Sequence, residues 1–403
     1  MPARRVVITG MGVVSALGTG IPAFSEALFE GRTGIRPLTC VEPGKLRFTQ
    51  GAEVQGYRAE DHFDSKVLSM LDPFAQYALV AAREAVSLSG ITFEPARTAV
   101  ITGTGGGGQF TTDGGFLDLY DRHLPRVNPL TIPRIMSSAA ASHISMEFGT
   151  TGPVFTVSTA CSSANHAIGQ AFWHIRNGVC DAALAGGSEA VFSYGFLRSW
   201  EAMRVVSPGT CRPFSRDRDG MILGEGSGML VLEEREAARS RGAVILGEIA
   251  GFGMSADASH ITQPSPAGAA AAMRMAVADA DLALEQIGYV NAHGTGTTAN
   301  DSSETRAIRD VFGDAADSLK VSSTKSMHGH ALGAAGALEA IATALALQRQ
   351  CAPPTVNYRV PDPECNLNVV PNRSERFTSE AALSNSFAFG GLNAVLVLRG
   401  GNS

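Results

Sequence analysis

The chain has 403 residues, of which 44% are hydrophobic and 17% charged, so it can bury a large core in one wide domain or two fused ones. The formal net charge of -6 and the pI near 5.9 give no general attraction to nucleic acid or to anionic lipid, which argues against both as partners. The six cysteines form no CxxC pair and no His/Cys ligand spacing. We therefore expect a reduced, cytoplasmic protein without structural zinc or another metal, and we expect no cofactor.

Two apolar stretches resemble targeting or membrane segments only at first sight. Residues 1–18 carry two arginines ahead of an apolar run, but their glycines and β-branched residues predict a strand and a turn, and no clear small-residue cleavage site follows. The longest apolar stretch, Ala331 to Leu347, contains Glu339 and several glycines and is short for a bilayer span. We expect a mature N-terminus, a buried helix and no membrane insertion.

Between its 45 glycines the chain alternates short apolar strands with alanine-rich helical segments, which is typical of an α/β fold with helices on both faces of a sheet. The strands predicted for the first half are Val6 to Thr9, Ala99 to Thr102, Val154 to Ser158, Ala182 to Ala185 and Met229 to Leu232. Those predicted for the second half are Val244 to Gly251, Ile287 to Ala292, Leu319 to Ser322 and Ala394 to Leu398.

Three helices have clear limits in the sequence. The first begins at Asp72 and Pro73, an N-cap acid followed by proline at the first helical position, and stops at Gly90. Its apolar face consists of Phe74, Tyr77, Ala78 and Ala81. A second helix should run from Cys161 to Gly178 and a third from Leu332 to Arg349, each soon after a predicted strand.

A strand, a tight turn and a helix of small residues thus occur once in each half of the chain. This predicts that the halves repeat one architecture, although their sequences barely resemble each other. We place the junction near Gly247, so that residues 1–247 form the first half and residues 248–403 the second. No Pro/Ser-rich linker or low-complexity segment marks the junction.

Cys161 lies in VSTACSSANHAIG, where a predicted strand gives way to a helix. A thiol there would meet the positive end of the helix dipole and unpaired backbone N–H groups, which lower the pKa of a cysteine from its free value of about 8.5. This setting favours a nucleophile. The residues alone leave open a buried cysteine that serves as a small hydrophobe, and Cys180 and Cys351, which lack the setting, are assigned to packing.

His293 stands at a strand end in YVNAHGTGTTANDSSE and is followed by small, flexible, hydroxyl-bearing residues. A single histidine can be an ordinary polar residue, but the glycines here let backbone and substrate approach closely, and Thr295 and Thr297 could line a polar pocket. We interpret Asp301 as a helix N-cap and Glu304, three residues on, as its capping-box partner. That structural role is sufficient for both acids.

The segment SSTKSMHGHALGAAGALEA offers Lys325, His328 and His330 in one turn ahead of the third helix. No Asp, Cys or third His is spaced to complete a metal site, so we interpret the histidines as proton or hydrogen-bond donors, with His328 exposed and incidental. The C-terminal SNSFAFGGLNA predicts a glycine-rich turn between strands. Its backbone N–H groups could stabilise an oxyanion, or the turn could be an ordinary tight connection.

Another glycine-rich stretch, Gly103 to Phe110, follows a predicted strand but lacks the GK[ST] ending of a phosphate loop. Neither a clear following helix nor a suitably spaced ribose acid supports a dinucleotide fold. We therefore expect no nucleotide binding.

Taken together, these segments resemble the β-ketoacyl-acyl-carrier-protein synthase family, the elongating condensing enzymes of type II fatty acid or polyketide synthesis. The resemblance covers essentially the whole chain in order. TACSSANHAIG resembles the nucleophile motif, NAHGTGT the first histidine motif, KSMHGHALGAAGALEA the lysine-histidine motif and SNSFAFGG the oxyanion turn. RPFSRDRDGMILGEGSG, from Arg212 to Gly228, resembles a further family segment.

The resemblance implies a thiolase-type α/β fold, in which two similar halves form a five-layered αβαβα arrangement. It also implies a dimer, either of two copies or with a chain-length-factor-like subunit, and an acyl carrier protein as partner. An acidic carrier should prefer local basic residues. From position and charge, the candidates are Lys66, Arg122, Arg126 and Arg204.

The resemblance also implies catalytic roles. Cys161 would accept an acyl group from a carrier-protein thioester, with the amides of Cys161 and Phe389 as oxyanion hole. His293 and His330 would hydrogen-bond the malonyl thioester oxygen as carbon dioxide leaves, which suits two neutral imidazoles in a dry pocket. The resulting carbanion would attack the acyl-Cys161 carbonyl.

Other residues receive supporting roles from the same resemblance. Lys325 would tune the site electrostatically, and Glu339 would be a buried structural or orienting acid, beside the structural acids Asp301 and Glu304. The positions implied for substrate binding are Thr295, Thr297, Gly106 and Phe387.

Two departures from the usual family pattern concern the substrate. Gly106 stands where many fatty-acid members carry a bulky aliphatic gate to the acyl tunnel, which predicts a roomier or stiffer-chain pocket, suited to polyene or other polyketide-like intermediates. Ala388 and Leu392 stand where many relatives have glycine and threonine, so the mobility of the loop that carries Phe389 is expected to differ.

Three alternative functions stay open at this point. A noncatalytic chain-length subunit would lack the nucleophile, yet Cys161, His293 and His330 are all present. A thiolase or a coenzyme-A-primed synthase would use a different catalytic set, and histidine at position 330 with no second cysteine in the C-terminal turn speaks against both. A cysteine hydrolase would activate Cys161 with one histidine and leave the other without a role.

Overall fold

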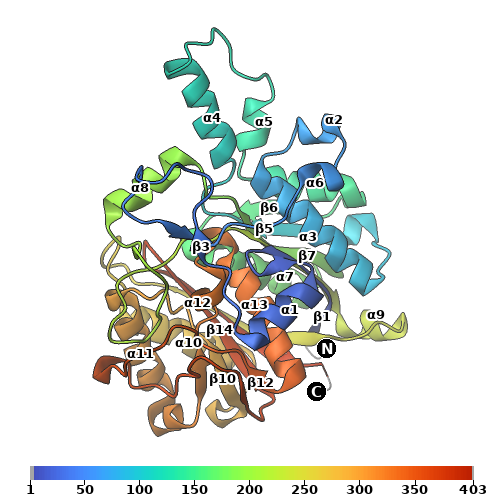
Figure 1. Cartoon of the computed structure of the whole chain (residues 1–403). Coiled ribbons are helices and arrows are strands. Elements are labelled where there is room, and N and C mark those ends of the chain that lie inside the picture. Colours follow the sequence, from blue (N-terminus) through green and yellow to red (C-terminus); the bar gives the residue numbers. More distant parts are fainter. Residues whose placement is uncertain (1–3, 402–403) are drawn as a thin grey trace.

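A computed structural model describes residues 4–401 (Figure 1). Residues 1–3, at the start of the segment considered above as a leader, and residues 402–403 lie outside the described part. The main strands follow one hydrogen-bonded path, β11-β10-β14-β15-β9-β1-β8-β7-β5-β6. Those of the first half are β1 (Val6–Ser15), β5 (Thr98–Gly103), β6 (Val154–Val157), β7 (Ala182–Glu189) and β8 (Gly226–Glu234). Those of the second half are β9 (Gly247–Ala256), β10 (Ile287–Asn291), β11 (Lys320–Ser322), β14 (Ala381–Ala388) and β15 (Leu392–Gly400).

The two halves have the same topology. Counted within each half, the strands run outward from the junction in the order first, fifth, fourth, second, third. In the first half β5 is parallel to β6 and β7, while β8 is antiparallel to β7 and β1. In the second half β10 is parallel to β11 and β14, while β15 is antiparallel to β14 and β9. The halves meet where β1 pairs with β9, from Val6 opposite Ile249 to Ile8 opposite Gly247.

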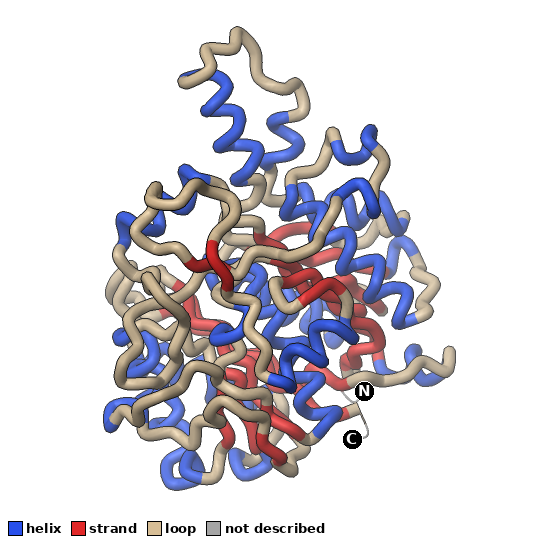
Figure 2. The backbone as a smooth tube through the Cα atoms, viewed as in Figure 1, coloured by secondary structure: helices blue, strands red, loops and turns tan. Residues whose placement is uncertain are grey.

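Helices form the other layers, and Figure 2 shows the strands running between them. On the first half, α3 (Pro73–Ser89) and α6 (Ala139–Phe148) cover one face; on the second, α10 (Pro266–Asp279) packs on β9 and β15, with α11 (Thr298–Phe312) beside it. Between the halves, α7 (Ser163–Arg176) and α13 (Ala335–Arg349) contact each other and strands of both halves. The prediction of two similar halves in five layers is confirmed.

The sequence explains why α7 can pack so closely against the strands of the first half. Its first turn packs against two strand glycines, Gly103 and Gly187. A Cβ at Gly103 would stand 2.5 Å from the carbonyl carbon of Ser163, and one at Gly187 would stand 2.7 Å from the Cβ of Ala164. Only glycine permits this approach, which brings the N-terminal end of α7, with Cys161, onto the strand ends.

The predicted limits of the first helix are also found. Asp72 accepts a hydrogen bond from the N–H of Phe74 at 3.3 Å, and Gly90 ends α3 with φ of 61°. The apolar stretch Ala331 to Leu347 becomes a short 3-10 turn and most of α13, both buried. Within residues 4–401, no helix is long and apolar enough to cross a membrane.

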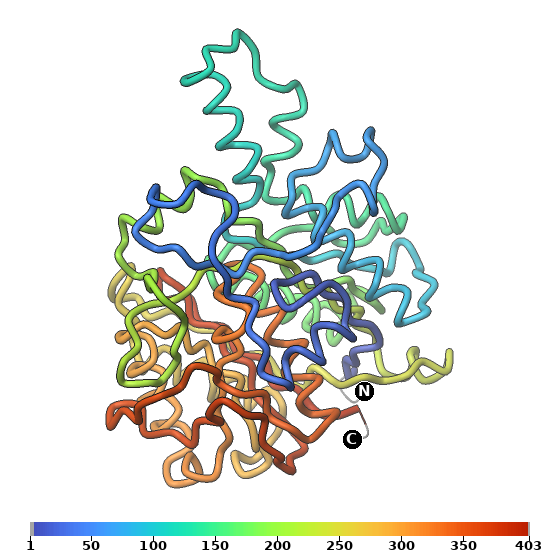
Figure 3. Tube along the Cα trace, viewed as in Figure 1, coloured from blue at the N-terminus to red at the C-terminus, as the bar shows by residue number. Residues whose placement is uncertain are grey.

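Smaller elements complete the described chain. The helices are α1 (Ile21–Glu30), α2 (Ser65–Leu68), α4 (Gln109–Tyr120), α5 (Thr131–Ile135), α8 (Tyr194–Met203), α9 (Arg235–Ser240) and α12 (Lys325–His328). The short strands are β2 (Gly18–Thr19), β3 (Arg36–Pro37), β4 (Gln50–Gly51), β12 (Cys351–Ala352) and β13 (Glu375–Arg376). Figures 1 and 3 show that α4, α5 and their connection project away from the body of the molecule.

Three sequence predictions need correction. The strand predicted from Val244 begins at Gly247, because Val244 is exposed in the connection from α9. The strand β14 was not predicted, because AALSNSFA contains no β-branched residue, and pairing on both edges, with β10 and β15, defines it. A helix does follow the glycine-rich stretch, since α4 begins at Gln109.

Candidate active site

Cys161 lies in a tight turn between β6 and α7. Ala160, just before it, has φ of 50°, a left-handed conformation that is costly for a residue with a side chain. The Ser163 hydroxyl holds the turn, since it accepts from the N–H of Thr159 at 2.9 Å and donates to the carbonyl of Ala160 at 2.6 Å. The nucleophile candidate is thereby placed at the start of the helix, as predicted, and only 7% of Cys161 is exposed.

The electrostatic prediction for Cys161 was wrong in direction. Burial raises the pKa of this thiol to about 12, and the charge of Lys325 and the N–H groups of Phe389 and Cys161 offset only part of that shift. Desolvation of the thiolate therefore outweighs the helix terminus. The thiol is protonated at neutral pH until a substrate changes its surroundings.

His293 follows the end of β10. Its backbone is held by Glu304, and its ring contacts Lys325. The Glu304 carboxylate accepts from the N–H groups of His293 and Gly294, both at 2.8 Å. The ammonium of Lys325 lies 3.3 Å from Nδ1 of His293. A lysine can only donate, so Nδ1 is the acceptor and the proton of the neutral ring is on Nε2.

Lys325 is fully buried and forms an ion pair with Glu339, which is also fully buried. Burial raises the pKa of Glu339 to about 7, against the opposing effect of the lysine charge. The expectation that Glu339 is a buried orienting acid fits this contact. His328 is not exposed as predicted: its ring is buried, with Nε2 2.9 Å from the hydroxyl of Thr324, and burial lowers its pKa to about 3.

His330 is held by its backbone against the first half of the chain. Its N–H donates to the carbonyl of Ile222 at 2.7 Å, and its carbonyl accepts from the N–H of Gly224 at 2.9 Å. Its ring centroid lies 5.3 Å from that of His293, with the planes at 84°. Burial, and then the charge of Lys325, lowers the pKa of both rings well below the usual histidine value. Both imidazoles are therefore neutral at physiological pH, as expected.

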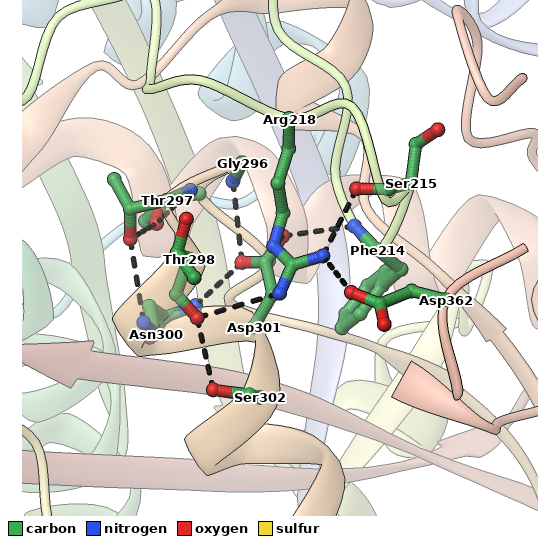
Figure 4. A network of polar contacts seen from close by, with 12 residues as sticks. Phe214, Ser215, Arg218, Gly296, Thr297, Thr298, Asn300, Asp301, Ser302 and Asp362 are labelled. Atoms are coloured by element: carbon green, nitrogen blue, oxygen red, sulfur yellow. Dashed lines mark hydrogen bonds and ion pairs between the residues drawn. The ribbon is translucent and has the colours of Figure 1, made fainter. Parts of the chain in front are cut away.

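The capping box predicted for α11 is not present. The helix begins earlier, and its N-cap is Thr297, whose side chain accepts from the first turn. Asp301, now inside the helix, accepts instead from the N–H of Phe214 at 2.8 Å and of Gly296 at 3.2 Å (Figure 4). Glu304 bonds the histidine turn described above. Both acids are buried and accept hydrogen bonds from neighbouring loops. Their predicted structural role is therefore found, but through these contacts and not through a capping box.

One cavity of about 120 Å³, whose lining also includes exposed residues such as Ile261, brings most of the predicted residues together. It is lined by Cys161, His293, Thr295, Thr297, His330, Phe387 and Phe389, among others. The two threonine hydroxyls lie 2.9 Å apart. Gly106 does not line this cavity, and Lys325 lies behind the His293 ring rather than at the cavity surface.

The glycine-rich turn Phe389–Gly390–Gly391 joins β14 to β15 beside the cysteine. Its N–H at Phe389 and the N–H of Cys161 both face the sulfur. The Phe389 ring stacks on Trp200 of α8, with centroids 6.3 Å apart. These two amides are the donors that the family resemblance implies for an oxyanion hole.

Glu189, at the end of β7, was missed by the sequence analysis. It is fully buried and accepts from the N–H groups of Gly105 at 2.6 Å, Gly106 at 2.9 Å and Gly333 at 2.9 Å. It therefore ties the glycine-rich loop of the first half to the start of α13. An acid that ends the small-residue strand AALAGGSE was the available signal, because a lone buried charge requires several donors.

Within residues 4–401, no group of three or more His, Cys, Asp or Glu side chains could hold a metal ion. Two like α/β halves, with a cysteine and two neutral histidines around one cavity at their junction, define the class of thiolase-fold condensing enzymes.

Comparisons with known proteins agree with this class. The family descriptions "Beta-ketoacyl synthase, N-terminal domain" and "Beta-ketoacyl synthase, C-terminal domain" match residues 3–238 and 246–359. Nodulation protein E of Rhizobium sp. (strain N33) is 48% identical, covering 98% of this chain and 99% of that protein. The 3-oxoacyl-[acyl-carrier-protein] synthase 2 of Staphylococcus aureus (strain COL) is 40% identical, covering 98% of both chains.

Among solved structures, "The ishigamide ketosynthase/chain length factor" superposes with a TM-score of 0.94 at 39% identity, covering 99% of both chains. The chain belongs to the β-ketoacyl synthase family. It is an acyltransferase-type condensing enzyme of fatty acid or polyketide chain elongation.

Proposed function

We propose that this chain joins an acyl group held on Cys161 to the two-carbon unit of malonyl-acyl-carrier protein, giving β-ketoacyl-acyl-carrier protein and carbon dioxide. The observation that carries the proposal is the convergence of one thiol and two neutral imidazoles, those of His293 and His330, on one cavity. A cysteine hydrolase would need only one of these rings, as the base for Cys161, and would leave the other without a role.

In the first step the Cys161 sulfur attacks the thioester carbon of the acyl-loaded carrier. The carbonyl oxygen becomes an oxyanion held by the N–H groups of Cys161 and Phe389. The bond to the carrier sulfur then breaks, and the thiol proton of Cys161 ends on that leaving sulfur. Because burial raises the pKa of the Cys161 thiol, this proton must leave the sulfur as the new carbon–sulfur bond forms.

In the second step malonyl-carrier protein enters and loses its carboxylate as carbon dioxide. The electron pair of the broken carbon–carbon bond forms an enolate, whose oxygen accepts from Nε2–H of His293 and from the His330 ring. The enolate carbon attacks the acyl-Cys161 carbonyl, the carbon–sulfur bond breaks, and the thiolate takes up a proton. Lys325 holds Nδ1 of His293 as an acceptor, so that Nε2–H stays directed to the substrate.

We assign Thr295, Thr297 and Phe387 to the wall that contacts the carrier-linked substrate, since all three line the cavity. Gly106 would instead lie near the acyl chain that Cys161 carries. Its N–H is bound by Glu189 at 2.9 Å, which keeps the loop close to the cysteine turn without adding a side chain there. We propose that the missing side chain admits long or stiff acyl chains, including polyene and other polyketide-like intermediates.

A second chain of the same fold would complete the enzyme, as two copies or as a pair with a chain-length-factor-like subunit. The α4–α5 projection exposes large apolar side chains to solvent, including Phe116 at 55%, Tyr120 at 74% and Ile132 at 64%. Strand β6 also ends the sheet path with one edge unpaired within residues 4–401. Apolar patches and free strand edges of this kind are usually covered by a partner.

The four basic residues expected at the carrier surface are all exposed, but they lie on different elements. Lys66 is on α2, while Arg122 and Arg126 are on the α4–α5 projection, where Arg122 already pairs with Asp118 at 2.8 Å. Arg204 ends α8, whose residue Trp200 lines the cavity. We propose Arg204 as the first contact for an acidic carrier. All six cysteines are free, in keeping with a proposed cytoplasmic location.

The decisive experiment is intact-mass spectrometry after incubation with acyl-carrier proteins of increasing chain length, followed by malonyl-carrier protein. The wild type should gain one acyl group and then discharge a β-ketoacyl product. Cys161→Ala should gain none, with a loss of rate of roughly a millionfold, as when another covalent nucleophile is removed. Cys180→Ala, a buried cysteine away from the cavity, is the matched control and should behave as the wild type.

The possible outcomes test the condensing role and the pocket assigned to Gly106 separately. No adduct with any chain in the presence of an added partner subunit would overturn the condensing role. Adducts with the shortest chains alone would leave condensation intact and overturn the pocket assigned to Gly106.

A further inference from the structure

Arg218 lies behind the cavity, in the loop that connects α8 to β8 (Figure 4). Only 2% of its side chain is exposed, and it lies between two carboxylates. Its Nη1 donates to Asp362 and, at 2.9 Å, to the carbonyl of Ser215. Its Nε lies 3.8 Å from Asp301 and its Nη2 3.5 Å from the carbonyl of Thr298. One guanidinium thus joins its own loop, the first turn of α11 and the segment around Asp362, which are far apart in the sequence.

The carboxylate beside Arg218 holds part of the cavity wall. Asp301, which is fully buried, accepts from the N–H of Gly296 at 3.2 Å and from the Asn300 side chain at 3.1 Å. Asn300 lines the cavity, and so do Thr295 and Thr297 on either side of Gly296. The first turn of α11 is therefore fixed from behind by an ion pair that never reaches the substrate.

The same carboxylate holds a strained residue against the histidine turn. Phe214 is buried with φ of 63°, which a bulky residue adopts only when its surroundings impose it. Its N–H donates to Asp301 at 2.8 Å. A Cβ on Gly294 would stand only 3.0 Å from the Phe214 ring, so the two residues are close neighbours. Movement of Phe214 would displace Gly294 and, with it, the cavity wall from Thr295 to Asn300 that follows.

An arginine suits this position better than a lysine. Its planar fork meets the carboxylate of Asp362, the carboxylate of Asp301 and a backbone carbonyl at one time, and a lysine ammonium is a single compact charge. The Arg218→Lys change therefore keeps the charge but removes the geometry.

We propose that Arg218 is a positioning residue for the cavity wall from 295 to 300, and that it sets how tightly the carrier-linked thioester is held. This inference rests on the proposed function, because that wall is assigned there to the carrier-linked substrate. Arg218 touches neither Cys161 nor the two histidines, so it should affect the KM for malonyl-carrier protein more than the chemical steps.

The test compares steady-state condensation by the wild type and Arg218→Lys, both as the full assembled enzyme. We expect the KM for malonyl-carrier protein to rise about tenfold, the equivalent of about 1.4 kcal/mol of lost binding free energy. The kcat should change little, and the rate at which iodoacetamide alkylates Cys161 should be unchanged. An unchanged KM, or a loss confined to kcat, would overturn the inference.

Two further variants keep the test decisive if Arg218→Lys folds poorly. Asp362→Asn weakens the ion pair that holds Arg218 on the side away from Asp301. It should raise the KM for malonyl-carrier protein by a smaller factor than Arg218→Lys does. A folded Asp362→Asn enzyme with the wild-type KM would overturn the inference. Arg241→Lys is the matched control, since Arg241 forms a two-point pair with Glu233 at 2.8 and 2.6 Å away from the cavity. It should leave the KM unchanged.

The failure of this inference can be told from that of the proposed function. If the wild type forms no acyl adduct and no condensation product, the proposed function fails. If the wild type condenses normally and Arg218→Lys has the same KM, only the role of Arg218 fails.

Discussion

The two halves of the molecule use the same turn for different chemistry. In the first half, left-handed Ala160, with φ of 50°, begins a 3-10 turn that leads into α7. In the second half, left-handed Leu332, with φ of 43°, begins a 3-10 turn that leads into α13. The first turn presents the Cys161 thiol, and the second follows directly on His330. A repeated backbone has thus brought the Cys161 thiol and the His330 ring to one cavity.

Two buried acids, one in each half, have different partners. Glu339 of the second half forms an ion pair with Lys325. In the first half Glu225 is 5% exposed, and its contacts within the described chain are the N–H of Val54 at 3.0 Å and the hydroxyl of Tyr77 at 3.4 Å. Burial is the main reason that the pKa values of the two imidazoles are lowered, and the charge of Lys325 lowers them further. The Lys325 charge therefore lies in the half that contains the two histidines proposed to assist decarboxylation.

The largest expected effect concerns the separate roles proposed for the halves, acylation in the first and decarboxylation in the second. His293→Ala and His330→Ala should each lower condensation by about a hundred- to thousandfold, the usual result of removing one donor to a developing oxyanion. Both should still acquire an acyl group on Cys161, because that step uses the amides of the oxyanion hole. Intact mass and product formation, measured on the same samples, separate the two steps.

A histidine outside the cavity is the control for that experiment. His174→Ala, on α7, removes a half-buried ring that contacts the carbonyl of Gln170 at 2.7 Å, and it should change neither step. If His293→Ala and His330→Ala also lost acylation, the two halves would not act separately.

The ion pair of the second half predicts the next largest effect, on stability. Lys325→Met leaves Glu339 buried without its cation and should lower the free energy of unfolding by about 3 to 5 kcal/mol. Urea denaturation measures this change. Lys325→Met with Glu339→Leu should regain most of the loss, because a buried pair can be replaced by apolar residues of similar size.

A more exposed ion pair on the same half provides the comparison. Lys320 contacts Glu375 at 2.6 Å, with 23% and 39% of the side chains exposed. Lys320→Met should cost no more than about 1 kcal/mol, as for most exposed pairs. Equal losses for the two single variants would show that burial of the Lys325 pair adds nothing.

The unpaired acid of the first half predicts the smallest effect, of opposite sign. Burial raises the pKa of Glu225 to about 8, while an unfolded glutamate has a pKa of about 4.3. Its contribution to stability is therefore complete below about pH 4.3 and is lost as the pH rises toward 8. Glu225→Gln keeps the acceptor oxygen without the charge and should raise Tm by about 2 to 4 °C at pH 8.

The pH dependence is the diagnostic feature of that variant. The difference in Tm between Glu225→Gln and the wild type should shrink from pH 8 to pH 5, since the wild-type carboxyl is then mostly protonated in the folded state. A constant difference across this range would mean that Glu225 does not change its charge there.

Local patterns predicted much of the fold and of the site. The alternation of strands and helices, the limits of α3 and the position of Cys161 at a strand-to-helix turn all depend on neighbours within a few residues. The ordered motifs identified the cavity residues Cys161, His293 and His330 for the same reason. That Cys161 would share one cavity with two histidines more than a hundred residues further along the chain was expected from the family resemblance.

The properties that only the tertiary structure decided all depend on distant partners or on loss of water. Strand β14 exists because β10 and β15 pair with it, since its own residues have little strand preference. Asp301 bonds loops instead of a helix end, and Arg218 is defined by groups from three segments. The raised pKa of Cys161 follows from burial, which no local pattern measures. Sequence determines which groups are present and in which local turn, but solvation and long-range contacts determine their charge and their partners.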